Sequence, residues 1–164
     1  MLNLPCYYGK DSVVPLLLAH HDIDVNLKQN EGWTPFWSAC SKGRFSCARL
    51  LLKDSRVKVN EPENDGFTPL WYAASLGRLD VIKWWIASGR EMDLGTPGDY
   101  TTDAIGAAKK YGKTEMLTLL ERFKSDAAKT RSEVRRELGI TGQYYSYYYY
   151  SILFLFSSFF ILGS

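Results

Sequence analysis

The sequence lacks a strong excess of charge of either sign. Its 164 residues carry 20 lysines and arginines against 18 aspartates and glutamates, a formal net charge of +2. Proteins that bind nucleic acids through their overall charge have a marked basic excess. The charge balance therefore argues against a nucleic-acid partner. Basic residues are denser over 109–136, and we interpret them as a solvated helix face rather than as an RNA or anionic-lipid contact.

Cysteine and histidine are also scarce. The three cysteines have no metal-like or secretory spacing, and the N-terminus has neither the basic start nor the apolar run of a signal peptide. We therefore expect a reducing, cytoplasmic setting. The two histidines, His20 and His21, fall in one turn, where the further ligands of a zinc site do not converge. Neither a metal nor any other cofactor is expected.

Motifs of catalysis are missing as well. The sequence has no nucleophile elbow and no metal-binding helix motif, and the glycines of GTPGDY (95–100) lack the lysine and the downstream Ser/Thr of a phosphate loop. Cys6 and Cys40 occupy one repeated position whose next member is Ala74, which favours buried small side chains over a nucleophile. We therefore expect no enzymatic activity and no small-molecule substrate.

What the sequence does contain is a repeated phrase. GWTPFWSAC (32–40) returns as GFTPLWYAA (66–74), 34 residues further on. The glycines that follow each phrase, Gly43 and Gly77, are also 34 residues apart, and one more step of 34 back from Gly43 reaches Gly9. A period of this length is typical of repeat proteins, in which each unit buries its apolar face against its neighbour.

Each period has the chemistry of two short antiparallel helices and a turn. Thr34 and Thr68 can cap the first helix, and the proline after each falls at the first helical position, where its missing N–H costs nothing. A glycine then ends that helix, and an amphipathic segment such as FSCARLLL (45–52) supplies the second. The pattern predicts an all-α solenoid of helix-turn-helix units with short hairpin loops.

The period and the Thr-Pro phrase resemble the ankyrin repeat, whose usual signature is Thr-Pro-Leu-His followed by Ala. The resemblance covers roughly residues 1–123. It departs from the family pattern at Trp37 and Trp71, which stand where ankyrin repeats usually have a histidine with a structural hydrogen-bonding role. The resemblance implies a non-catalytic module that binds another protein through its hairpin tips and concave face.

On this basis the chain divides into six segments. They are a half repeat (1–31), two good repeats (32–65 and 66–98), a degenerate repeat (99–124), a capping helix (125–139) and a tail (140–164). The half repeat is either a worn N-terminal cap or the product of a truncated gene model, and Pro5 is expected to interrupt its helix. Thr130 and Glu133 form a capping-box pair that predicts the start of a last helix, which would cover the end of the stack.

The resemblance also implies where a partner binds. The position between glycine and threonine faces the concave side of ankyrin repeats, and here it is aromatic three times, at Trp33, Phe67 and Tyr100. These rings either form a contact stripe or pack on their own hairpins, and both alternatives stay open. The other contact positions of the family carry over to eight residues: Asn30, Glu31, Ser41, Lys42, Asn64, Asp65, Ser75 and Leu76.

The C-terminal segment differs in composition from the rest of the chain. No side chain from Leu138 to Ser164 is charged, six of the seven residues in 144–150 are tyrosines, and 152–162 is apolar. We interpret the tail first as read-through of a pyrimidine-rich sequence or as a disordered, aggregation-prone segment. The alternative is a tail anchor over residues 144–162, which would span roughly 28 Å as a helix and tether a cytosol-facing adaptor to a membrane.

Overall fold

The computed structural model describes residues 2–140. Within this range the chain forms nine α-helices and no strand. The helices are α1 (Asn3–Tyr8), α2 (Val14–Leu18), α3 (Pro35–Lys42), α4 (Phe45–Leu52), α5 (Pro69–Ser75), α6 (Leu79–Ser88), α7 (Ala104–Lys110), α8 (Thr114–Ser125) and α9 (Ala127–Glu137). The predicted all-α solenoid is therefore confirmed.

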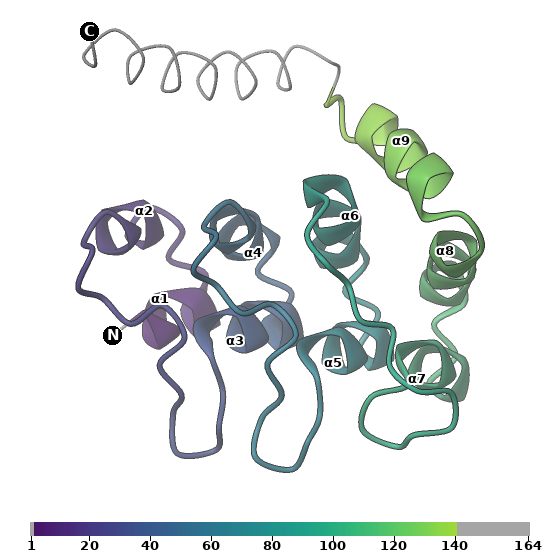
Figure 1. Ribbon diagram of the computed structural model, residues 1–164, viewed down its shortest axis with the longest axis horizontal. Helices are drawn as coiled ribbons and strands as arrows, with labels where there is room; N and C mark the ends of the chain where they lie inside the picture. The colour runs from purple at the N-terminus through teal and green to yellow at the C-terminus, as the bar shows by residue number, and fades with distance from the viewer. Residues whose placement is uncertain (1, 141–164) are drawn as a thin grey trace, which may run out of the picture.

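The first eight helices form two layers (Figure 1). Helices α1, α3, α5 and α7 lie in an inner row, α2, α4, α6 and α8 lie in an outer row, and the hairpin loops project beyond the inner row. Each inner helix packs on the next, and α4 packs on both α2 and α6. We call the surface of the inner helices and hairpin loops the inner face, and the surface of the outer helices the outer face.

The hydrophobic core fills the space between the two layers. Phe36 of α3 meets Trp85 of α6 edge-on, with ring centroids 4.9 Å apart, and both side chains are fully buried. Leu51 and Leu70 are equally buried beside them in one continuous cluster. Because this cluster joins residues from successive units, a single unit does not bury its own apolar side chains, and stability depends on stacking.

The predicted helix starts are confirmed. The hydroxyl of Thr34 accepts a hydrogen bond from the Trp37 N–H at 3.1 Å, and the hydroxyl of Thr68 accepts one from the Trp71 N–H at the same distance. In the degenerate repeat Asp103 takes over this role, since its carboxylate accepts from the Gly106 N–H at 2.8 Å. The same capping chemistry therefore opens α3, α5 and α7.

Pro5 does not interrupt the first helix, contrary to expectation. Helix α1 begins at Asn3, so Pro5 falls in its first turn, where backbone N–H groups have no partner inside the helix. The missing N–H therefore costs nothing there. The helix ends at Gly9, whose φ of 73° is left-handed.

The start of α9 also differs from the expectation. The helix begins at Ala127, with the Asp126 carboxylate accepting from the Lys129 N–H at 2.9 Å, so the Thr130–Glu133 pair lies inside the helix and does not cap it. Thr130 is buried, and Glu133 forms an ion pair with Arg122 of α8. An aspartate one turn earlier is an equally good cap, and the contact with α8 decides between the two.

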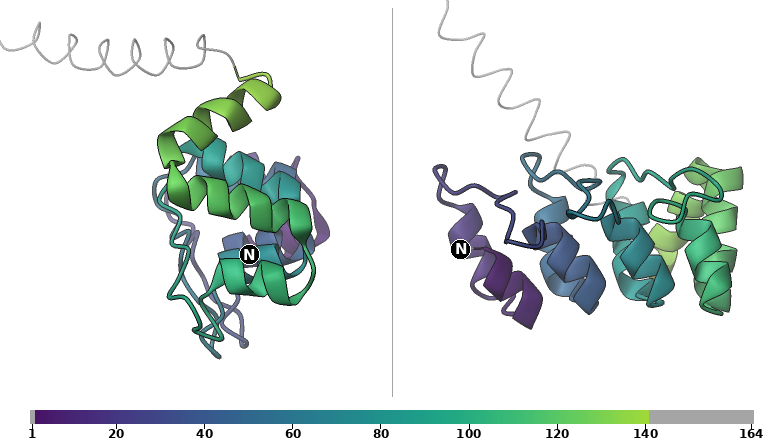
Figure 2. Two further views of the ribbon diagram at one scale, coloured as in Figure 1. Left: turned by 90° about the vertical axis from the view of Figure 1, so that its right-hand side faces the viewer. Right: turned by 90° about the horizontal axis from the view of Figure 1, so that it is seen from below.

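Helix α9 does not cover the end of the stack as expected. It packs on α6 as well as on α8. Figure 2 shows it lying across the outer layer, while α7 and α8 face the viewer at the end of the solenoid. Val134, in the middle of α9, is fully buried in this contact. The helix therefore packs across the outer helices of the last two repeats, α6 and α8, instead of extending the stack beyond α7 and α8.

Arginines of the two good repeats bind carbonyl groups at or just after the helix ends of the unit before. Arg90 donates to Leu52 O at 3.4 Å, to Asp54 O at 2.8 Å and to Val57 O, all at or after the end of α4. Its counterpart 34 residues earlier is Arg56. Carbonyl groups in the last turn of a helix have no partner within the helix, so these contacts satisfy them from outside.

Arg56 makes the equivalent contacts at the end of α2. Its guanidinium donates to Leu18 O at 2.7 Å and to His20 O at 3.4 Å, and it also pairs with the Asp54 carboxylate at 2.6 Å. The hydrogen bond from Arg56 lowers the pKa of Asp54 below its ordinary value. Asp54 therefore stays charged and fixes the guanidinium over the helix end.

Two further sets of arginines act in the same way. On the inner layer, Arg44 donates to Tyr7 O and Arg78 to Ser41 O, each at 3.2 Å. At the end of α6, the role passes to α9, where Arg131 donates to Ile86 O at 3.2 Å and Arg135 to Ala87 O at 2.8 Å. We refer to these contacts as the arginine clamps.

The hairpin loops are stacked through their backbones. Asn64 donates from its side chain to Asn30 O at 2.7 Å, and from its backbone N–H to Glu31 O at 3.2 Å. Gly32 lies against this residue with a φ of 83°, and a β-carbon there would be 2.4 Å from Asn64 Oδ1. Gly32 is therefore required both by its own backbone conformation and by the close approach of the next loop.

We predict that Arg90→Ala lowers the free energy of unfolding by about 2 kcal/mol, because three carbonyl groups lose a charged donor. The measurement is urea denaturation followed by circular dichroism. Arg136→Ala, at an exposed position on α9, is the matched control and should change the value by less than about 0.5 kcal/mol. Equal effects of the two substitutions would show that the Arg90 clamp does not stabilise the stack.

We predict that Gly32→Ala is more destabilising than Gly98→Ala. Both glycines have a φ near 83°, but a β-carbon at Gly98 has no neighbour within 4 Å. Gly98→Ala should therefore cost about 1 kcal/mol of backbone strain, and Gly32→Ala a further 1–3 kcal/mol or so from overpacking against Asn64. Urea denaturation of both variants tests this, and a Gly98→Ala variant at least as unstable as Gly32→Ala would contradict it.

Candidate functional site

Seven aromatic rings form a continuous cluster on the inner face. We call it the aromatic ladder; its members are Trp33, Trp37, Phe67, Trp71, Tyr72, Tyr100 and Tyr111. They come from the hairpin loops and from the inner helices α3, α5 and α7 with their ends. The ladder therefore runs across three successive units of the solenoid.

The first part of the ladder joins two repeats. Trp33 stacks flat on Trp37, with ring centroids 5.1 Å apart and an interplanar angle of 1°. Trp37 then meets Tyr72 of the next unit edge-on at 4.5 Å. Both geometries are favourable for aromatic pairs, so this contact fixes the position of Trp33 and Tyr72 relative to each other.

The second part continues into the degenerate repeat. Phe67 lies 4.6 Å from Trp71 and 5.3 Å from Tyr100, measured between ring centroids. Trp71 also meets Tyr111 edge-on at 6.1 Å. The ring of Phe67 thus links the hairpin of its own unit to that of the next one.

The C-terminal end of the ladder is its most exposed part. Trp37 and Trp71 are buried, whereas Tyr100 is 64% exposed and Tyr111 is 45% exposed. Trp33 and Phe67 pack on Trp37 and Trp71 of their own units, and Tyr100 packs on Phe67 and Trp71 of the preceding one. All three rings keep some exposed surface, so a role in contacting a partner stays a prediction.

A lysine lies over the exposed end of the ladder. The Lys110 ammonium is 5.1 Å from the centroid of the Tyr100 ring and 5.5 Å from that of Tyr111. A cation over a tyrosine face is attracted by the ring electrons. The exposed end therefore combines two phenol groups with one positive charge.

Acidic residues border the ladder at the hairpin loops. Glu63 is buried and its carboxylate accepts from the Phe67 N–H at 2.9 Å, which holds that loop in place. Burial, followed by the nearby charges of Glu63 and Asp65, raises the pKa of Tyr72 above its ordinary value. Tyr72 therefore keeps its proton over the neutral pH range and can donate a hydrogen bond.

The structure places the other expected contact residues in two groups. Asn30, Glu31, Asn64 and Asp65 are exposed at the hairpin tips, and Lys42 and Leu76 are exposed at the far ends of α3 and α5. Ser41 and Ser75 are 5% exposed, and their hydroxyls donate to Ser38 O and Tyr72 O within their own helices. These two serines offer almost no surface, and Asn64 is already bound to Asn30 O.

Three residues of this face were not found from the sequence: Tyr72, Tyr111 and Lys110. Tyr72 follows Trp71 inside the repeated phrase, where the preceding unit has Ser38. An aromatic residue in place of a serine, one position after an aromatic of the ladder, was a signal that could have drawn attention to it. Tyr111 and Lys110 close α7, and no pattern in the chain points to them.

The tryptophan at the usual histidine position keeps a hydrogen-bonding role in the first good repeat. The Trp37 indole N–H donates to Phe67 O at 3.3 Å, across the boundary between the two units. At the equivalent position of the next unit, Trp71 makes ring contacts. Of these two tryptophans, only Trp37 donates an indole hydrogen bond within the described residues. The substitution therefore preserves the donor in one unit and enlarges the ladder in both.

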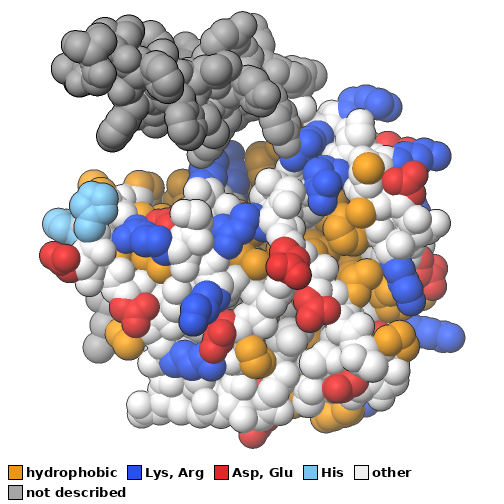
Figure 3. Space-filling model, viewed as in Figure 1, with side chains coloured by type: hydrophobic (Ala, Val, Ile, Leu, Met, Phe, Trp, Pro, Cys, Tyr) orange, Lys and Arg blue, Asp and Glu red, His pale blue; other side chains and the backbone are white. Residues whose placement is uncertain are grey.

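The cysteines lie in the core, as the sequence analysis interpreted them. Cys6, Cys40 and Cys47 have no exposed surface. Hydrogen bonding to Cys47 and burial raise the pKa of Cys6, and burial raises the pKa of Cys40, so both remain protonated at neutral pH. His20 and His21 are exposed at the end of α2, visible as the histidine side chains in Figure 3. Over residues 2–140 no group of three potential metal ligands converges.

The membrane hypothesis concerns residues that the structure does not describe. No helix within 2–140 is long and apolar enough to cross a bilayer. The tyrosine-rich and apolar segment, 144–162, lies outside the described residues.

We predict that Trp37→Phe destabilises the protein by about 1 kcal/mol more than Trp71→Phe. Both substitutions remove the same atoms from the ladder, but only the first leaves the half-buried carbonyl of Phe67 without its donor. The free energy of unfolding of each variant, measured in urea, tests this. Equal losses would indicate that the indole bond between the two units contributes nothing.

The chain matches a model of a known protein family. The family model for ankyrin repeats, with three copies, matches residues 2–96. No curated protein has a sequence that matches this chain. Ankyrin repeats generally mediate protein–protein interactions and are typically non-catalytic. Because the matched residues make up more than half of the 164, the chain belongs to the ankyrin repeat family.

Proposed function

We propose that this protein is a non-catalytic scaffold or adaptor that binds a segment of a partner protein on the aromatic ladder. The observation that supports this most directly is the exposure of Tyr100 and Tyr111 beside the half-buried Phe67, Tyr72 and Trp33. Tyrosine and tryptophan are the residues most enriched at binding hot spots. They offer a large contact area and lose little conformational freedom on binding.

The rings of the ladder are packed on neighbouring groups before a partner arrives. Phe67 is held by Glu63 through its N–H, and the Tyr100 ring packs on Phe67 and Trp71. A surface whose side chains are already ordered pays less entropy on association. We therefore assign the main contacts to the rings, and weaker rim contacts to Glu31, Asp65 and Lys42.

The edges of the inner face favour a partner segment with charges of both signs. Glu31 and Asp65 lie at the hairpin tips, whereas Lys42 and Lys110 lie at the opposite ends of the inner helices. Rim charges of this kind guide association and set the orientation of a bound segment more than they add affinity. A segment that crosses the ladder would present basic residues to the tips and acidic residues to the helix ends.

We predict that Tyr100→Ala weakens partner binding about 30-fold while the free energy of unfolding falls by only about 1 kcal/mol, because the ring is largely exposed and loses a few ring contacts. The assay compares quantitative mass spectrometry of proteins captured from the source cell by the native and variant chains, followed by titration of the recovered partner.

Tyr8→Ala is the matched control for this experiment. Tyr8 is 60% exposed, close to the value for Tyr100, and its ring contacts Tyr7 rather than a member of the ladder. The control should retain full binding. Equal capture by Tyr100→Ala and the native chain would exclude the ladder as the binding site.

A further inference from the structure

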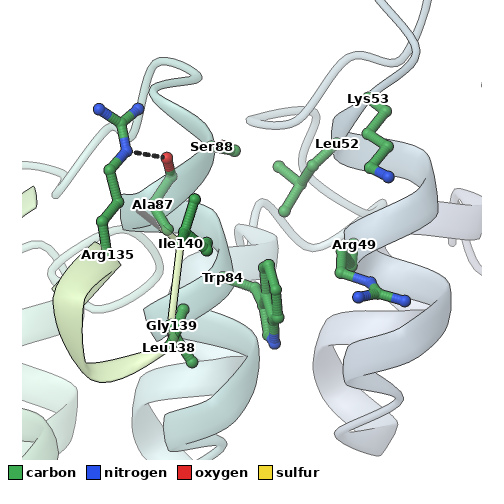
Figure 4. A pocket seen from close by; sticks show the side chains of 10 residues that line it. All are labelled: Arg49, Leu52, Lys53, Trp84, Ala87, Ser88, Arg135, Leu138, Gly139 and Ile140. Carbon is green, nitrogen blue, oxygen red and sulfur yellow. Dashed lines mark hydrogen bonds between the residues drawn. The ribbon is translucent and has the colours of Figure 1, made fainter. Parts of the chain in front are cut away.

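A groove of about 530 Å³ opens on the outer face, away from the aromatic ladder. It lies between α4, α6 and the segment that follows α9 (Figure 4). Its lining residues include Arg49, Leu52, Lys53, Trp84, Arg135 and Ile140. We call it the outer groove.

The end of α9 builds one wall of the outer groove. Gly139 adopts a left-handed φ of 69°, and Ile140 N–H donates back to Arg135 O at 2.8 Å. This turn brings Ile140 back towards α6, and the clamp from Arg135 to Ala87 O holds the wall in place. The groove is therefore a fixed feature of the packing between α6 and α9.

The floor of the outer groove is apolar. Leu52 and Ala87 are buried at its base, and Trp84, Leu138 and Ile140 are half-buried around them. Trp84 faces the opening between α4 and α6 in Figure 4. A large ring at the base of a concave surface gives a bound apolar side chain contact area that a flat surface does not.

The rim of the outer groove is positively charged. Arg49, Lys53 and Arg135 are among the lining residues, and no lining residue is acidic. Arg49 lies over the Trp84 ring, with its guanidinium carbon 5.0 Å from the centroid. Lys and Arg side chains gather along this edge of the molecule in Figure 3.

Two carboxylates of the adjoining segments are already paired. Asp54, just after α4, is bound by Arg56 at 2.6 Å, and Glu137, at the end of α9, is bound by Lys83 at 2.9 Å. They therefore do little to neutralise the rim. A ligand with negative charge and apolar side chains is complementary to both parts of the groove.

We propose that the outer groove is a second interaction surface, which binds an acidic segment of a partner protein. Apolar side chains of that segment lie on Trp84 and Ile140, and its carboxylates pair with Arg49 and Lys53. Arginine binds a carboxylate through two parallel hydrogen bonds, which favours a side-chain or backbone carboxylate at the rim. This surface lies on the opposite side of the solenoid from the ladder, so the two can be occupied together.

The test is a selection of phage-displayed random 12-residue peptides on the full chain, with counter-selection on the Arg49→Glu/Lys53→Glu variant. We expect groove-dependent peptides that combine Asp or Glu with large apolar residues. Synthetic copies should bind the variant at least about tenfold more weakly, and raised salt should weaken their binding to the native chain. No groove-dependent peptides, or peptides without acidic residues, would overturn the proposal.

Matched variants separate the groove from general charge and from the ladder. Lys124→Glu/Lys129→Glu makes the same change in net charge at exposed positions on α8 and α9 that do not line the groove. This variant and Tyr100→Ala should bind the selected peptides like the native chain. A loss with the lysine control would make the interaction non-specific and overturn the proposal, and thermal unfolding verifies that every variant is folded.

A photo-crosslinker at position 84 identifies the occupant of the groove in the full chain. With p-benzoylphenylalanine in place of Trp84, irradiation should crosslink the selected peptide, besides the side chains of the same chain that line the groove. A crosslink to residues 141–164 of the same chain, or to a second copy, would overturn the proposal, because the groove would then be filled without a partner.

Discussion

The structure depends on arginines that bind the ends of helices in the preceding unit. Between Asn3 and Ser88 the helices are 5 to 10 residues long, so groups without a partner inside the helix are a large share of each one. Arg56 and Arg90 satisfy these carbonyl groups across the boundary between units, and a positive charge there also complements the helix dipole. A short helix thus becomes stable only when the next unit is in register. The same contacts therefore supply both the stability and the geometry of the stack.

The arrangement of side chains on the two proposed binding surfaces depends on this register between units. Trp37 reaches Tyr72 and Phe67 only because α5 lies beside α3 at a fixed height, and each ring of the ladder is supported by the neighbouring unit. On the outer face, α9 replaces the arginine of a further repeat with Arg131 and Arg135 and ends the series of clamps. Because α9 crosses α6 instead of following the outer row, it leaves the groove beside Trp84. The stacking of units through the arginine clamps therefore positions both the aromatic ladder and the outer groove.

The features predictable from the sequence are those that depend on local chemistry. Thr34 caps α3 because a threonine before proline can do so in any context, and the period of 34 residues places that cap twice. The start of α9 was not predictable, because Asp126 and Thr130 are both good caps and the contact between Glu133 and Arg122 selects one of them. The repeated arginines of the clamps could have been noticed in the sequence, since Arg56 and Arg90 are one period apart. Their partners could not, because these are backbone carbonyl groups, which leave no pattern in the sequence. The outer groove could not be predicted from the sequence, because its shape depends on the angle at which α9 packs on α6.

The repeat alignment also shows how the setting of Trp84 differs from that of the first unit. Residues 16, 50 and 84 occupy one position of the period, as leucine, leucine and tryptophan. Leu16 is 67% exposed with no helix beside it to form a second wall, whereas Trp84 has α4 on one side and the end of α9 on the other. At the last of these positions a large ring lies between both walls. The change from leucine to tryptophan thus coincides with a concave setting for the ring, and the guanidinium of Arg49 lies over its face.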